Sequence, residues 1–72
     1  MDFGTKVRVM RAARGMSQLD LAQATGINNR ELSYIETGRM LPSPEMEVAI
    51  KSALRWPVRA DEAFAILEGE AA

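Results

Sequence analysis

The chain has 72 residues with nine basic and ten acidic side chains, so its formal net charge is −1 and it has room for one small domain, residues 1–72. It contains neither cysteine nor histidine, which excludes disulfides, thiolate metal sites and the side chain most often used as a general base. No apolar run approaches the roughly 20 residues that span a bilayer, and the first residues lack the basic-then-apolar order of a signal peptide. We therefore expect a cytoplasmic protein with no membrane segment.

No stretch alternates β-branched or aromatic residues over four or more positions, so the sequence predicts an all-α fold of five short helices. The first predicted helix covers residues 3–14. Phe3, Val7 and Met10 share its apolar face at a spacing of about one helical turn. Gly15 follows, and glycine commonly ends helices because it adopts positive φ without strain.

The second predicted helix begins after Ser17, a favourable N-cap residue, and Asp20 lies at the position that completes a capping box. Leu21 and Ala22 face the expected core, and the small alanine allows another helix to approach closely. Gly26 ends this helix after about two turns.

The third predicted helix covers residues 28–37 and is separated from the second by only a tight turn. Asn28 is its expected N-cap, with Glu31 at the capping-box position. Leu32 and Ile35 form its apolar face, and a glycine follows its last residue.

The fourth predicted helix begins at Ser43 and Pro44, an N-cap residue followed by proline at the first helical position, and it ends near Leu54. A Trp-Pro break separates it from a fifth predicted helix over residues 59–68. The apolar face of that last helix consists of Ala60, Ala63, Phe64 and Leu67.

Charge is distributed unevenly along the chain. Residues 1–39 carry six basic and four acidic side chains, whereas residues 40–72 carry three basic and six acidic ones. A mildly basic half is therefore joined to an acidic half, and the acidic half suits a basic partner.

Residues 17–38 combine two short helices at a steep crossing, a small residue for close approach, a glycine at the turn and an apolar wedge. This pattern resembles the helix-turn-helix of the phage lambda-type repressor and Cro family, also called XRE-like regulators. The resemblance covers roughly residues 3–56 without gaps. It rests on Arg11, Ser17, Gln18, Leu21, Ala22, Gly26, Ile27, Leu32, Ile35, Glu36, Gly38, Arg39 and Pro42.

The resemblance implies a lambda repressor-like DNA-binding domain whose third helix lies in the major groove. Helical periodicity turns the side chains opposite Leu32 and Ile35 outward. Arginine can pair with guanine, and asparagine with adenine, through two hydrogen bonds each. We therefore predict base contacts from Asn29, Arg30, Ser33 and Tyr34, the alternative being that these positions are simply solvated.

Glu31 has two candidate roles, because its carboxylate could complete the cap or accept a hydrogen bond from a cytosine amino group; we prefer the cap. Phosphate contacts set register and affinity without selecting sequence. The resemblance and the favourable location of cations and helix N-termini assign such contacts to Gln18, Asn28, Arg39, Lys6 and Arg14.

The resemblance also implies a buried ion pair between Arg11 and Glu36, which would tie the first helix to the end of the third. The last part of the chain is more apolar than one terminal helix needs, and this family often forms dimers through its last helices. The candidates for a dimer contact are Trp56, Val58, Phe64 and Leu67, the alternative being that they cap the small core within one chain.

The predicted function is that of a small transcription regulator, expected to be a repressor, in a prokaryotic or phage-encoded context. It would bind a near-palindromic operator in double-stranded DNA as a homodimer, without metal or cofactor. The alternative is a protein-interaction module of the same fold, such as an antitoxin that neutralises a basic partner through its acidic half. An enzyme is not expected, because no nucleophile with a base, metal-ligand cluster or phosphate-binding glycine loop is present.

Overall fold

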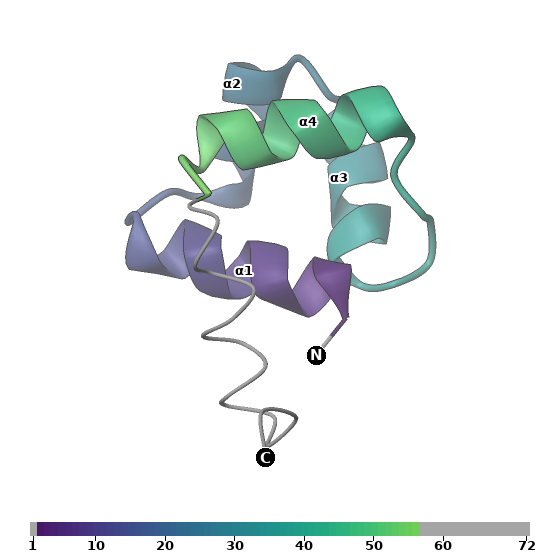
Figure 1. Cartoon of the computed structure of the whole chain (residues 1–72), viewed down its shortest axis with the longest axis horizontal. Helices are drawn as coiled ribbons and strands as arrows, with labels where there is room; N and C mark the ends of the chain where they lie inside the picture. The colour runs from purple at the N-terminus through teal and green to yellow at the C-terminus, as the bar shows by residue number, and fades with distance from the viewer. Residues whose placement is uncertain (1, 57–72) are drawn as a thin grey trace.

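The computed structural model describes residues 2–56, and this part of the chain forms four helices and no strand (Figure 1). The all-α prediction is therefore confirmed for these residues. The fifth predicted helix, residues 59–68, lies outside them, so the described part holds four helices rather than five. The helices are α1 (Phe3–Ala13), α2 (Gln18–Thr25), α3 (Asn29–Glu36) and α4 (Pro44–Ala53).

The four helices enclose a single core. The third helix, α3, packs against both α1 and α2, and α2 packs in turn against α4. In Figure 1, α1 and α4 run across the view, α2 passes behind α4, and α3 lies between α4 and α1 on the right. None of these helices has the length and apolar character that a membrane crossing demands.

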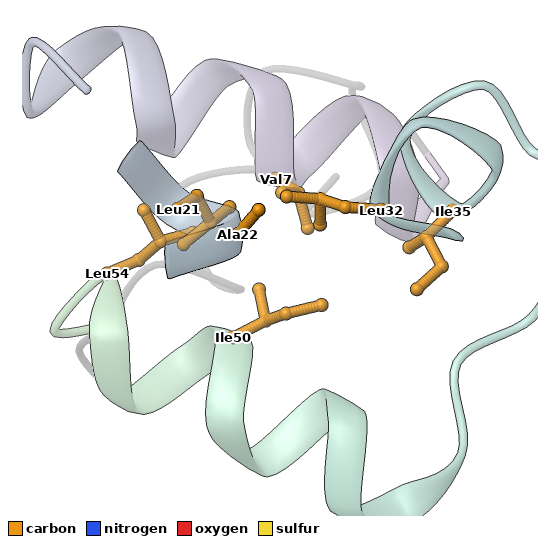
Figure 2. Packing of buried hydrophobic residues seen from close by; sticks show 7 residues of the cluster. All are labelled: Val7, Leu21, Ala22, Leu32, Ile35, Ile50 and Leu54. Carbon is orange, nitrogen blue, oxygen red and sulfur yellow. The ribbon is translucent and has the colours of Figure 1, made fainter. Parts of the chain in front are cut away.

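Each helix contributes to the core, and Leu54 adds to it from the position directly after α4. Figure 2 shows these side chains pointing into the space between the helices. Burying one aliphatic side chain of this size stabilises a fold by about 1.5–3 kcal/mol, so a few such residues matter greatly in so short a chain. The buried apolar residues are Val7, Leu21, Ala22, Leu32, Ile35, Ile50 and Leu54.

Side-chain caps fix where the helices begin. The predicted capping box of α2 is confirmed, since the Asp20 N–H donates to Ser17 Oγ and the Ser17 N–H donates to Asp20 Oδ2, both over 3.0 Å. Hydrogen bonds from the backbone and side chain of Ser17 hold the pKa of the Asp20 carboxyl below its ordinary value. Ser43 caps α4 as predicted, and Asp2 caps α1, a role that the sequence analysis missed.

Three helices end in the same way, with the residue after the C-cap in the left-handed conformation. At α1 and α3 this residue is Gly15 (φ 67°) and Gly38 (φ 78°), but at α4 it is Arg55 (φ 51°). In α4 the Arg55 N–H donates to the Ser52 carbonyl (3.1 Å) and the Trp56 N–H to the Lys51 carbonyl (2.9 Å), the bonds of a Schellman motif. The left-handed conformation strains every residue except glycine, so α4 ends at a conformational cost that α1 and α3 avoid.

The first helix approaches the end of α3 so closely that the two backbones touch. Gly4 is buried inside α1, and a Cβ atom built on it would lie 2.8 Å from the Glu36 carbonyl oxygen and closer still to that of Ile35. Real Cβ atoms do not come this near to backbone oxygens. Gly4 therefore permits the contact between α1 and α3.

We expect Gly4→Ala to destabilise the protein by about 1–3 kcal/mol, the usual cost of overpacking a tight contact. Glycine-to-alanine changes inside helices ordinarily stabilise by about 1 kcal/mol, so the sign of the effect is diagnostic. Urea-induced unfolding of the parent and the variant measures it. Thr5→Ala, one position further along α1, is the control and should change stability little. A Gly4→Ala variant as stable as the parent would contradict the close approach of the helices.

Arg55→Gly should stabilise the protein by about 0.5–1 kcal/mol, because glycine removes the strain at the end of α4. The reciprocal change is Gly15→Arg, at the same position after α1. A Cβ at Gly15 would meet nothing within 4 Å, so this variant should lose stability through backbone conformation alone. Thermal unfolding of both variants measures these changes in stability. If both variants shift the midpoint of unfolding in the same direction, backbone strain at Arg55 is not the cause.

Candidate nucleic-acid interface

The turn between α2 and α3 sets the angle at which α3 leaves the body of the domain. Gly26 adopts φ 74° at the C-cap of α2. The Thr25 hydroxyl donates to the Leu21 carbonyl over 2.8 Å and accepts from the Ile27 N–H over 3.2 Å. The glycine in the turn was expected from the sequence, whereas the role of Thr25 was not. Together they hold the three-residue connection, residues 26–28, in one conformation.

Helix α3 has a buried inner face and a polar outer face. Leu32 and Ile35 lie in the core, as the periodicity predicts. Arg30 is exposed on the opposite side, and Asn29, the first residue of the helix, is exposed as well. Tyr34 is 37% exposed, and Ser33 is half-buried, so the latter presents less of its side chain. The exposed part of α3 thus displays an amide, a guanidinium and a phenol.

The N-terminus of α3 is capped differently from the prediction. The Asn28 side chain accepts from the Arg30 N–H over 2.8 Å, two residues along, and not from the N–H of Glu31. The prediction that Glu31 completes a capping box is wrong, because its carboxylate makes no hydrogen bond or ion pair within the described part of the chain. Asn28 is exposed, and its side-chain amide N–H groups are the donors that it can offer to a phosphate.

A buried ion pair fixes the far end of α3. Glu36 is 2% exposed, and Arg11 Nε and Nη2 donate to its two carboxylate oxygens over 3.1 and 3.0 Å. The remaining Nη1 of Arg11 donates to the Met16 carbonyl over 3.0 Å. Gln18, at the first position of α2, donates from Nε2 to Glu36 Oε1 over 3.4 Å. The carboxylate therefore receives hydrogen bonds from α1 and α2 at once.

The cations expected to contact phosphate differ in how far they are engaged inside the protein. Arg39 is exposed, and its N–H donates to the Tyr34 carbonyl over 2.8 Å, so its backbone is fixed by the last turn of α3. Lys6 is half-buried on α1. Arg14 instead donates to the carbonyls of Leu54 (2.8 Å) and Arg55 (3.1 Å) at the end of α4. Because its guanidinium serves this structural contact, we leave Arg14 out of the candidate interface.

Trp56, a candidate dimer residue in the sequence analysis, packs within the chain. Its ring stacks on Phe3 with the centroids 5.8 Å apart and the planes 17° from parallel. Lys51 Nζ lies 5.6 Å from the centroid of the same ring, and it also pairs with Glu47 over 3.4 Å. Trp56 is partly buried and packs against the core. The other dimer candidates, Val58, Phe64 and Leu67, lie outside the described residues.

Comparison with known families supplies an independent finding. A family model described as a helix-turn-helix domain matches residues 2–62 and belongs to the lambda repressor-like (XRE) group. The matched range includes all four helices, and the resemblance inferred from the residues is therefore confirmed. No curated protein and no solved structure matches the chain.

Removing one partner of the Arg11–Glu36 pair should cost about 3–5 kcal/mol, because the other charge would remain buried without compensation. Arg11→Met together with Glu36→Met should cost much less than the sum of the two single losses. Urea unfolding of the parent, both single variants and the double variant forms the cycle. If a single variant no longer folds, cooperative unfolding regained in the double variant leads to the same conclusion. Additive losses would show that the two side chains do not stabilise one another.

Proposed function

Because this chain belongs to the helix-turn-helix domain family, a DNA-binding family typical of transcription regulators, we propose that it reads double-stranded DNA with α3 in the major groove. In this arrangement the N-terminal residues of α3 contact base edges while α2 crosses the DNA backbone. We propose Asn29, Arg30 and Tyr34 as base-contacting residues, with Ser33 at the margin.

The observation that carries this proposal is the division of α3 into two faces. Its inner face is fixed by Leu32 and Ile35 in the core and by Glu36 in the ion pair. Its outer face exposes Arg30, whose guanidinium makes no hydrogen bond or ion pair within residues 2–56. A guanidinium held outward on a rigid helix and free to form two hydrogen bonds fits O6 and N7 of guanine.

Phosphate contacts are proposed at both ends of the helix pair. Gln18 lies at the N-terminus of α2, where backbone N–H groups favour an anion. Its bond to Glu36 orients the side chain, as a positioned phosphate contact requires. Arg39 follows α3 and is exposed. These contacts supply affinity and register, whereas the outer face of α3 supplies sequence selectivity.

We further propose that two copies act together as a repressor on a near-palindromic operator. Two α3 helices related by a two-fold axis would address half-sites about 34 Å apart, which is one turn of DNA. The small size of the domain supports this arrangement, because a single copy of α3 offers only a few base contacts. Doubling the contacts raises both affinity and selectivity.

A second candidate function is favoured by apolar surface away from α3. Leu41, in the connection between α3 and α4, is 88% exposed, and Val48 on α4 is 68% exposed. The first turn of α4 also carries the acidic residues Glu45 and Glu47. Exposed apolar side chains together with carboxylates suit a basic protein partner. Such a partner would make the chain an interaction module, with or without DNA binding.

Selection from a pool of random DNA duplexes at moderate salt tests the main proposal. We expect the parent to enrich a near-palindrome, and Arg30→Ala to lose discrimination at one base pair of each half-site. A two-bond arginine contact is worth about 1–3 kcal/mol, or roughly 5- to 150-fold between the right and the wrong base.

Arg8→Ala is the matched control, since it removes the same charge from an exposed position on α1. It should weaken binding to every duplex slightly without changing the selected sequence. If Arg30→Ala enriches the same site as strongly as the parent, Arg30 does not contact a base. If the parent enriches no sequence even at low salt, the DNA-binding proposal fails. The exposed residues Leu41 and Val48 then become the first candidates for contact with a protein partner.

A further inference from the structure

The outer face of α3 carries a carboxylate that the fold does not use. Of the two acidic residues of α3, Glu36 is buried in the ion pair and Glu31 is exposed. The Glu31 side chain takes no part in the cap, which consists of the Asn28 side chain accepting from the Arg30 N–H. It forms no ion pair or hydrogen bond with any other described residue. Its neighbour Arg30 likewise has no hydrogen-bond or ion-pair partner among residues 2–56.

Helical geometry places Glu31 beside the residues proposed to contact bases. Successive residues of an α-helix are about 100° apart. The buried side of α3 is defined by Leu32, Ile35 and Glu36. Arg30 then lies opposite that side, with Glu31 about 100° round the helix from it in one direction and Ser33 about 60° in the other. Glu31 also lies in the first turn of α3, the part of a recognition helix that comes nearest to base edges.

A carboxylate at this position would change how strongly α3 binds different DNA bases. It is repelled by phosphates and by the acceptor atoms O6 and N7 of guanine and O4 of thymine. Adenine offers an amino donor, but its N7 acceptor lies next to that donor. Cytosine presents its N4 amino group as the donor of its major-groove edge. Cytosine is therefore the base whose edge best complements a group that accepts only.

We propose that Glu31 is a specificity-determining residue that accepts a hydrogen bond from the N4 amino group of a cytosine, next to the base pair contacted by Arg30. This inference rests on the proposed function, since it requires α3 to lie in the major groove. The Arg30 guanidinium, which only donates, then selects guanine, and the adjacent Glu31 carboxylate, which only accepts, selects cytosine. The carboxylate also disfavours duplexes that lack the cytosine.

Duplex selection with the full chain tests the proposal through Glu31→Ala and Glu31→Gln. The parent should enrich cytosine at one position of each half-site. Glu31→Ala should reduce that preference about tenfold and leave the other positions unchanged. Glu31→Gln should shift the preference from cytosine to adenine, because an amide both donates and accepts and can pair with adenine N6 and N7.

Glu45→Gln is the matched control. Glu45 is also an exposed acidic residue in the first turn of a helix, α4, and the substitution removes the same charge. It should strengthen binding to all duplexes slightly and equally, without changing base preference. Thermal unfolding of all the variants shows whether each remains folded at the temperature of the selection.

Three outcomes overturn the proposal, and they are distinguishable. If both Glu31 variants strengthen binding to every duplex alike, as Glu45→Gln does, the carboxylate only repels DNA and contacts no cytosine. If the parent itself enriches no sequence, the DNA-binding proposal fails and the cytosine contact fails with it. A parent that enriches a defined site, together with a Glu31→Gln variant that enriches that same site unchanged, refutes the cytosine contact alone.

Discussion

The position of α3 depends on one buried carboxylate. Glu36 is almost inaccessible to water, and burial of a charge is costly unless other groups compensate it. Compensation comes from Arg11 on α1 through two hydrogen bonds and from Gln18 on α2 through a third. Because the donors belong to different helices, satisfying the charge requires α1, α2 and α3 to take up one mutual arrangement. The orientation of α3 therefore depends on the hydrogen bonds to Glu36 as well as on apolar packing.

Intramolecular bonds also separate the charged residues of this chain into two groups. Arg11 and Arg14 are engaged by carboxylate or carbonyl oxygens inside the protein, whereas Arg30 and Glu31 on α3 have no such partner in the described part of the chain. Composition alone treats these side chains as equivalent. Their availability to another molecule is decided by the fold, and the side chains left available on α3 are polar groups whose hydrogen-bonding capacity matches base edges.

Local signals explain most of what the sequence predicted correctly. The capping box of Ser17 and Asp20 forms as expected because all its atoms lie within one helical turn. Contacts between distant residues leave no local signal in the sequence. Arg14, for example, donates to the carbonyl of Leu54, 40 positions away. Because every residue has a backbone carbonyl, the sequence does not indicate this partner. Gly4 did leave a signal, since an isolated glycine inside a helix pattern often marks close packing. The family resemblance supplied the Arg11–Glu36 contact, which periodicity alone could not.

The touching backbones of α1 and α3 couple folding to recognition. Gly4 meets the carbonyls of Ile35 and Glu36, so the contact closes a loop of about 30 residues that contains all of α2. Closing a loop of that size costs entropy before any contact compensates for it, and α3 is too short to persist alone in water. The helix proposed to enter DNA is therefore ordered only when the whole domain is ordered. Any duplex that binds it draws the unfolded population toward the native state by mass action, and the apparent stability of the protein rises with the concentration of its site.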